Sequence, residues 1–397
     1  MSKIIKIERL DDTIMDISGI GDCFYMTWAS DDRQYTNMND GFGWEDLPEF
    51  NDKFYNTKLF AINGDAPNHT FHYLPGYPEL ENDFTSEGRQ NHLHNRYYGF
   101  GIVAVGDRIY NFLGTLMQAT GVADYNAFIG VKLIYSDDNG ETWKNQDGSS
   151  PVVWEKWEDR NQDNMLFFNE PDAAFSILTV LQMGKAYQAN KDGYVYIYSN
   201  NGLTEGTMNQ LVMFRVKKDK VLDRSAYEYF TSIDADGEAV WSKDINERGI
   251  VYTFPEGWVN ETYGHPFGWQ PDIVYNEALD LYMMINWGIG VGEPEDKWFA
   301  KPSYLGIWTA PTPWGPWTQV HEETEWLPGG HKDTRAYIPR IAPKWIAEDG
   351  KSFWLVWTDF RSGIPGTGFF DIKTANDLKS SLPYYAFNCQ KVLIYTE

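Results

Sequence analysis

Five blocks with the same pattern recur along the chain, and each holds two short apolar strands joined by a polar turn. The first strands are expected at residues 23–28, 99–105, 175–181, 272–275 and 338–345. Their partners are expected at residues 35–38, 109–113, 194–198, 281–287 and 353–357. Asp and Gly recur in the turns between them, as is typical of antiparallel hairpins. Recurrence at this spacing is typical of the blades of a β-propeller.

Further strands lie between the pairs, at residues 131–135, 210–216 and 304–309, and would complete four-stranded sheets. Long helical periodicity is missing throughout. We therefore predict an all-β fold, a five-bladed β-propeller of four-stranded antiparallel blades that forms a single domain over residues 1–397. A β-sandwich is the main rival fold, and it explains the strands but not their recurrence.

One local motif, residues 136–143, reads S-x-D-x-G-x-T-W. The Asp side chain is expected to hold the backbone N–H groups of the turn, Gly140 to supply an unusual backbone angle, and Trp143 to pack beneath. The pattern resembles the Asp-box of sialidase-like propellers. Its role is expected to be structural.

Composition narrows the range of partners. The chain carries 33 Lys and Arg against 57 Asp and Glu, which gives a net charge of −24. Such a charge disfavours nucleic acids and anionic membranes. The chain also holds 17 Trp, 25 Tyr and 23 Phe, and aromatic faces with carboxylates suit a neutral polysaccharide or oligosaccharide. The alternative is that these rings fill the core of the sheets.

The two cysteines, Cys23 and Cys389, indicate neither a disulfide framework nor a cysteine-based zinc site. The first residues show no signal peptide, and no apolar run is long enough to span a bilayer. The compartment and the oligomeric state stay open. No cofactor is expected to be required, and a bound calcium ion stays an open alternative.

Polar residues are expected to converge at one rim of the propeller, where the first strand of each blade begins and the second ends. Asp22 and Asp40 lie at equal distances from a hairpin centre near residue 31, which predicts that they face each other. The same rule collects further residues from the other blocks: His92, His94, Asn95, Tyr98, Glu170, Asp172, Asn200, Trp269, Gln270, Asp272, Trp287, Arg335, Arg340, Asp359 and Arg361.

This mixture of acids, Arg, His and Trp suits a sugar-binding site, and hydrolysis of a glycosidic bond fits it best. That reaction needs one carboxyl to protonate the leaving oxygen and another to attack or to activate water. Repulsion between neighbouring carboxylates would keep a proton on one of them. Asp22 and Asp40 are the first candidates, with Glu170, Asp172 and Asp272 as alternatives. Both first candidates adjoin glycines, so a turn role is the competing interpretation.

Several stretches resemble a propeller family that includes bacterial endo-D-arabinanases acting on mycobacterial-type arabinan. They are residues 21–22, 39–41, 98–101, 224–230, 270–276, 308–311 and 314–317. The motifs Trp-Gly-Pro-Trp and Pro-Asp-Ile-Val-Tyr-Asn also occur in other furanosidase propellers. The resemblance implies internal cleavage of an arabinofuranoside polymer by two rim acids, with Asp22 and Asp40 at the matching positions.

Two other functions stay open at this point. A polysaccharide lyase could use His92 or His94 with Tyr97 or Tyr98 to remove a proton beside a uronate. The two histidines could also bind a metal ion or simply donate hydrogen bonds to substrate. A glycan-binding propeller without catalysis is the third possibility, because one fold hosts many activities.

Overall fold

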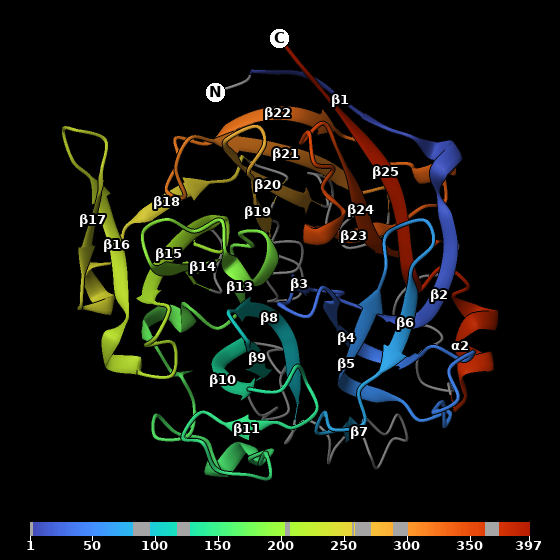
Figure 1. The fold of residues 1–397 in the computed structure, drawn as a ribbon, viewed down its shortest axis with the longest axis horizontal. Helices are drawn as coiled ribbons and strands as arrows, with labels where there is room; N and C mark the ends of the chain where they lie inside the picture. Colours follow the sequence, from blue (N-terminus) through green and yellow to red (C-terminus); the bar gives the residue numbers. More distant parts are fainter. Residues whose placement is uncertain are drawn as a thin grey trace.

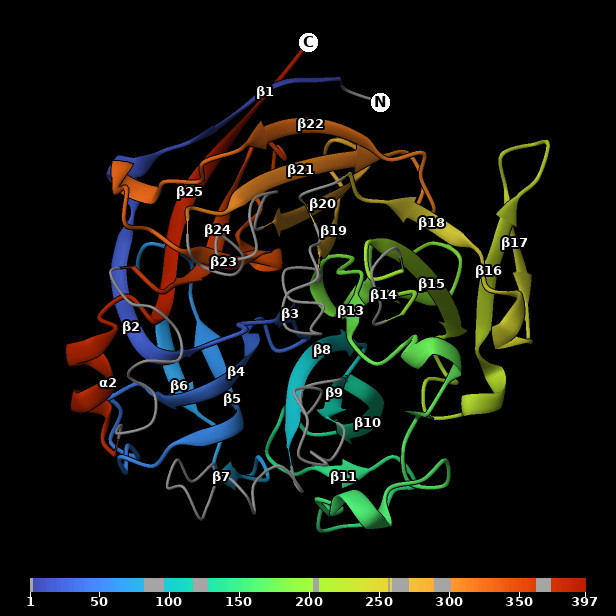
Figure 2. The same ribbon diagram turned by 180° about the vertical axis from the view of Figure 1, so that it is seen from behind.

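The structure, a computed structural model, describes residues 3–81, 96–116, 128–202, 207–255, 258, 271–288, 301–361 and 373–397. Over this part of the chain the architecture is almost entirely antiparallel β-sheet. The sheets fan out around a common centre (Figures 1 and 2) rather than stacking as two flat layers. The predicted all-β class is therefore confirmed, and the sandwich alternative is not supported.

The first sheet joins strands from both ends of the chain: β1 (Ile4–Arg9), β2 (Met15–Asp22), β3 (Met26–Trp28), β4 (Gln34–Gly43), β5 (Tyr55–Asn63), β6 (Thr70–Tyr73), β7 (Leu80–Glu81), β23 (Ala336–Ile341), β24 (Ser352–Asp359) and β25 (Ala386–Thr396). The second sheet holds β8 (Tyr97–Val105), β9 (Arg108–Leu116), β10 (Phe128–Ser136), β11 (Lys144–Asn145) and β12 (Phe167–Phe168).

The third sheet holds β13 (Leu178–Val180), β14 (Tyr194–Asn200), β15 (Gln210–Lys217), β16 (Glu228–Ile233), β17 (Ala239–Ser242) and β18 (Ile250–Thr253). The fourth holds β19 (Asp272–Asn276), β20 (Leu281–Gly288), β21 (Tyr304–Ala310) and β22 (Thr318–Glu323). One α-helix, α2 (Ala375–Ser381), occurs among the described residues. Short 3₁₀ turns lie at Asp11–Thr13, Trp157–Asp159, Pro171–Ala173, Lys185–Tyr187, Arg224–Ala226, Ile245–Glu247, Pro328–Gly330 and Pro343–Trp345.

All five predicted strand pairs are present, but three of the first strands are shorter than expected. The strand expected at 23–28 begins only at Met26. The strand expected at 338–345 ends at Ile341, because Pro343 cannot donate to the ladder and opens a 3₁₀ turn. The strand expected from residue 175 begins only at Leu178, and Phe175 has a φ of 57° that does not fit a strand. The sheets contain ten, five, six and four strands, so the expectation of uniform four-stranded sheets is wrong as stated.

Strand β25 joins the two ends of the chain. It pairs with β24 on one edge and with β1 and β2 on the other (Figure 1), through partners such as Ile7 with Ile394 and Ile20 with Ala386. This pairing brings the second half of β4 and the end of β2 beside residues from the last quarter of the sequence. The candidate site forms at this junction.

The turn at residues 136–143 has the expected internal hydrogen bonds. The Asp138 carboxylate accepts from the Thr142 backbone N–H at 2.8 Å, and Gly140 has a φ of 86°. The buried Trp143 packs edge-on against Tyr77, with ring centroids 5.3 Å apart. These contacts hold the turn between β10 and β11 against the loop that carries Tyr77, which agrees with the structural role predicted for this motif.

Many aromatic side chains fill the core, as the alternative interpretation of the composition predicted. Trp44, Trp258, Trp287, Trp308 and Trp326 are almost fully buried. Cys23 and Cys389 are buried as well, and neither is part of a disulfide. Among the helices of the described residues, none has the length and apolar character needed to cross a membrane.

Candidate active site

Asp22 is the last residue of β2, and its backbone pairs with Asn39 of β4 rather than with Asp40. The part of the hairpin nearer the turn keeps the predicted register. The register shifts by one residue before Asp22, in a region where Cys23 has a φ of 57° and Asp40 a φ of 42°. A prediction that counts residues outward from the turn assumes a regular hairpin, so it cannot account for such a shift in register. The predicted pairing is therefore wrong by one residue, although Asp22 and Asp40 stay neighbours.

The environment of Asp22 favours its protonated form. Burial raises the pKa of this carboxyl to about 7, and the negative charge of Asp40 adds to the effect. Hydrogen bonds from Cys23, Tyr337 and Tyr385 act in the opposite direction and lower the pKa. The Tyr337 hydroxyl donates to Asp22 Oδ2 at 2.9 Å. Asp22 keeps partial contact with solvent, so a proton on it can still reach an incoming ligand.

Two tyrosines from the end of the chain hold the acid pair together. Tyr337 lies in β23, and Tyr385 lies just before β25. The Tyr385 hydroxyl donates to the backbone oxygen of Asp40 at 2.9 Å and also interacts with the Asp22 carboxyl. Burial raises the pKa of both tyrosines, so both remain neutral donors. Sequence reasoning missed both residues, because the ring closure that brings them to Asp22 is a long-range event.

Asn56, in β5, fixes the orientation of Asp40. Its side-chain N–H donates to Asp40 Oδ1 at 3.2 Å, and its carbonyl oxygen accepts from the backbone N–H of Tyr97 at 2.8 Å. The side chain is buried and also interacts with the Tyr98 hydroxyl. The amide therefore has donors and acceptors satisfied on both sides, which locks its orientation. No motif in the sequence marks this residue.

Tyr98, which the sequence analysis predicted as a substrate-binding residue, lies close enough to Asp22 and Asp40 for their charges to act on it. It is buried, Arg96 Nη1 donates to its hydroxyl at 3.2 Å, and the charges of Asp40 and Asp22 act on its pKa, which burial raises strongly. The next residue is Gly99, where a Cβ would lie 2.5 Å from the side chain of Asn37. The glycine thus permits β8 to approach β4 closely, and this approach places Tyr98 beside the acid pair.

Asp272, predicted as a third acid, connects two sheets instead of facing open space. Its Oδ2 accepts from the backbone N–H of Ile341 at 2.7 Å, and its Oδ1 lies 3.9 Å from Arg340 Nη1. The buried Arg340 guanidinium lies 3.5 Å from the ring centroid of Tyr25. Burial raises the pKa of Asp272, and the positive charge of Arg340 opposes that shift. This arrangement is that of a buried structural ion pair between β19 and β23.

The acids predicted near the third block make ion pairs with cations of the third sheet. Glu170 Oε1 lies 3.3 Å from Arg224 Nη2, and Asp172 Oδ2 lies 3.1 Å from Arg248 Nη2. The Asp172 side chain is mostly exposed. Asn200 is buried and donates to the backbone oxygen of Gly202 at 2.6 Å. These contacts give each residue a local structural role and do not join it to Asp22.

In the predicted fifth block, the half-buried Arg335 and Arg361 lie around the buried Asp359 carboxyl. Asp359 Oδ1 accepts from the backbone N–H of Arg335 at 2.7 Å, and Asp359 Oδ2 lies 3.8 Å from Arg361 Nε. Burial raises the pKa of Asp359 to about 6. Trp287 is also buried and packs edge-on against Tyr337 at 5.7 Å. Trp287 therefore packs against Tyr337, the residue that donates to Asp22, and its ring is not exposed to solvent.

Five of the predicted binding residues lie outside the described residues: His92, His94, Asn95, Trp269 and Gln270. Within the described ranges, no group of three or more His, Cys, Asp or Glu side chains is arranged to hold a metal ion.

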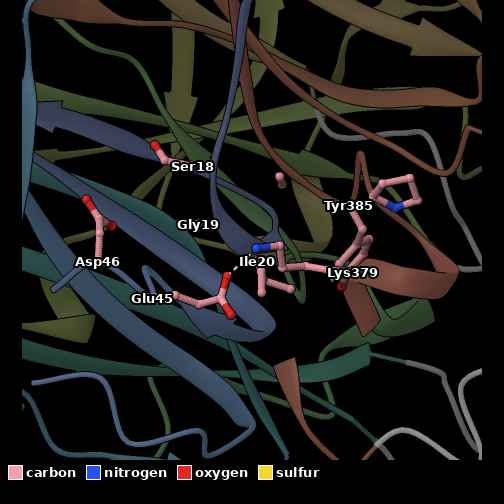
Figure 3. Close-up of a pocket in the computed structure, with 9 residues that line it drawn as sticks. Ser18, Gly19, Ile20, Glu45, Asp46, Lys379 and Tyr385 are labelled. Atoms are coloured by element: carbon pink, nitrogen blue, oxygen red, sulfur yellow. Dashed lines mark hydrogen bonds and ion pairs between the residues drawn. The ribbon is translucent and has the colours of Figure 1, made fainter. Parts of the chain in front are cut away.

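A pocket of about 300 Å³ lies between β2, α2 and the start of β25 (Figure 3). Its lining residues come from β2, from the segment after β4, and from the region of α2 and β25: Ser18, Gly19, Ile20, Glu45, Asp46, Lys379, Pro383, Tyr385 and Ala386. Tyr385 is shared, because its hydroxyl contacts Asp40 while the residue also lines this pocket.

Comparisons with known proteins give a partial match to one family and a broad match in fold. Residues 101–260 match a family model described as a domain of unknown function, DUF4185. No curated protein matches the sequence. Among solved structures, a Bacteroides ovatus protein to which hydrolase activity has been attributed is 13% identical, with a TM-score of 0.51. The match covers 95% of this chain and 87% of that one, so the two share a fold.

Two further solved structures are similar at lower scores. An α-L-arabinanase of Cellvibrio cellulosa, complexed with arabinohexaose, is 11% identical over 96% of this chain and 92% of its own, with a TM-score of 0.44. An α-L-arabinofuranosidase of Podospora anserina, in complex with cellotriose, is 12% identical over 96% of this chain and 91% of its own, with a TM-score of 0.43. At these scores neither carries an argument about this protein.

Proposed function

We propose that this protein is a glycoside hydrolase in which Asp22 is the general acid and Asp40 is the nucleophile or the base that activates water. The observation that carries the proposal is the raised pKa of Asp22, caused by burial and by the neighbouring Asp40 carboxylate. Two carboxyl groups whose environments separate their protonation states are what glycosidic cleavage requires.

The proton balance follows from the contacts of Asp22. Protonated Asp22 gives its proton to the glycosidic oxygen while the bond to the anomeric carbon breaks. Asp40 then forms the new bond to that carbon or takes a proton from the attacking water. The carboxylate left on Asp22 is stabilised by hydrogen bonds from Cys23, Tyr337 and Tyr385.

The substrate class comes from the family resemblance of the sequence, which implies an arabinofuranoside polymer cleaved internally. A net charge of −24 also favours a neutral glycan over an anionic one. A lyase mechanism is less well supported, because burial raises the pKa of Tyr97 and Tyr98 and makes both poor proton acceptors. Hydrolysis and the lyase reaction can be distinguished by incubating the protein with arabinan, with arabinogalactan and with a uronate polymer. New reducing ends from the first two indicate hydrolysis, whereas near-ultraviolet absorbance growing with the third would contradict the proposal.

We further propose that the fold has five blades. Dividing the ten-stranded sheet at β2 gives one blade of β3, β4, β5 and β6 and another of β23, β24, β25 and β1. The other three sheets supply the remaining blades. In this division Asp22 lies at the link between the last blade and the first, which agrees with its contacts to both.

The pH dependence of hydrolysis should show the titration of Asp22. The acid role needs the protonated form, whose population falls as the pH rises through about 7. We therefore expect kcat/KM to decline above that pH in rates measured between about pH 4 and about pH 9. Replacing Cys23 with Ala removes a hydrogen bond that stabilises charged Asp22, so the decline should move to higher pH. Cys389→Ala, at the other buried cysteine, should leave the pH of this decline unchanged. An unchanged profile in both variants would contradict the assignment of Asp22 as the general acid.

Asn56 should act as a positioning residue for Asp40. Asn56→Ala is expected to lower kcat by about 10²-fold with little change in KM, because a misplaced reacting group costs about that much. Asn56→Asp keeps the shape but adds a negative charge beside Asp40, so it should move the acidic limb of the pH profile upward. The matched control is Asn276→Ala, which removes another buried amide that donates to Gly350 O at 2.8 Å. If Asn276→Ala lowered kcat as much as Asn56→Ala, and Asn56→Asp did not move the acidic limb, the role of Asn56 would be only structural.

A further inference from the structure

The pocket between β2, α2 and β25 has an apolar floor and a polar rim (Figure 3). Ile20, Ala386 and Tyr385 are buried and form the floor, where the backbone of Ile20 pairs with that of Ala386. Glu45, Asp46 and Lys379 are exposed at the rim, and Lys379 forms an ion pair with Glu45 across it. Apolar C–H faces of a sugar suit such a floor, and sugar hydroxyls suit charged groups of both signs.

The pocket shares one residue with the acid pair and lies close to it along β2. Ile20 lies two residues before Asp22 in the same strand, and a strand rises about 3.3 Å per residue. Tyr385 lines the pocket, and its hydroxyl donates to Asp40 O at 2.9 Å and interacts with Asp22. A ligand in the pocket therefore lies against a residue that also holds both acids.

We propose that this pocket is a distal subsite that binds one or two neutral sugar residues of the polysaccharide whose bond the acid pair cleaves. The proposal rests on the proposed function. A volume of about 300 Å³ is at the small end of ligand sites, which span roughly 300–1,000 Å³. Glu45 and Asp46 make an anionic sugar a poor occupant, because only Lys379 offsets their charge at the rim. A polymer held in this subsite and at the acid pair together is cleaved internally.

The test compares substrates of different length. Ser18→Trp places a large ring in the pocket, and the double variant Glu45→Ala/Asp46→Ala removes two rim groups. Both are expected to raise KM for a long arabino-oligosaccharide about 10-fold, with kcat nearly unchanged. Both should leave kcat/KM for an aryl arabinofuranoside, which is too short to reach the pocket, as in the unaltered protein. The matched control is Asp236→Ala, an exposed acid in the β16–β17 turn.

Binding without turnover separates this proposal from the catalytic one. In the Asp22→Asn background, titration of the full-length chain with the same oligosaccharide should show weaker binding when Ser18→Trp is added. That result would support the subsite even if the unaltered protein hydrolysed no furanoside. Hydrolysis that keeps its full preference for long substrates in both pocket variants would overturn the subsite and leave the acid pair intact. Equal losses on long and short substrates would also overturn it.

Discussion

Replacing Asp22 with Asn is expected to reduce kcat/KM for arabinan hydrolysis by about 10²–10⁴-fold, the range that a general acid typically contributes. Asp40→Asn should be at least as damaging, because it removes the group that attacks or activates water. Reducing ends released from arabinan at fixed enzyme concentration measure both losses. Asp107→Asn, at an exposed acid in the turn between β8 and β9, is the matched control and should retain full activity.

The leaving group distinguishes the two roles. An aryl furanoside with a good leaving group needs little protonation, so Asp22→Asn should lose much less activity on it than on arabinan. Asp40→Asn should lose activity on both substrates. The reverse pattern would exchange the two assignments, and full activity in both variants would remove the acid pair from the mechanism.

We expect the substitution Asp22→Asn to lower activity but to raise the stability of the folded chain at neutral and higher pH. Its pKa in the folded chain, about 7, lies above the ordinary value of 3.8, so the folded state holds a proton that the unfolded state releases. Stability therefore declines as the pH rises from about 4 to about 7, where the charged form is forced into a buried site. Asp22→Asn should unfold at a higher temperature than the unaltered protein at pH 8, and this difference should shrink towards pH 4. A variant that is inactive because it is unfolded would show no such increase in unfolding temperature.

The sequence predicted those features that depend on local pattern. Short apolar segments, joined by turns that contain Asp and Gly, predicted the five strand pairs. The S-x-D-x-G-x-T-W pattern predicted the hydrogen bonds within its turn. Asp22 and Asp40 were also chosen correctly as neighbours, because a hairpin register can be counted from its turn. The count was wrong by one residue, since two left-handed residues shift the register beyond β3.

The surroundings of the acids could not be predicted in the same way. Tyr337 is separated from Asp22 by 315 positions in the sequence and reaches it only because β25 joins the two ends of the chain. Asn56 contributes through the orientation of one amide, which no spacing rule indicates. Asp272 was predicted as an acid of the site from its place at the start of a strand, yet its contacts with Ile341 and Arg340 depend on how two sheets pack.

The ion pair of Asp272 gives the largest stability effect we expect. Arg340→Met leaves the Asp272 carboxyl buried without its positive neighbour and removes the guanidinium from the ring of Tyr25. Breaking one partner of a buried pair costs about 3–5 kcal/mol, because the remaining charge is uncompensated. Urea unfolding followed by tryptophan fluorescence measures the loss. It should be smaller at pH 5 than at pH 8, since Asp272 can then take up a proton.

The double variant Arg340→Met/Asp272→Asn should recover part of the lost stability, because it removes the buried charge together with its partner. In the Asn variant the side-chain oxygen can still accept from the backbone N–H of Ile341, so the connection between β19 and β23 is retained. Hydrolysis by the double variant below its unfolding transition then tests the role of Asp272. Near-normal rates would support a structural ion pair, whereas a loss as large as that of Asp22→Asn would make Asp272 a third catalytic acid.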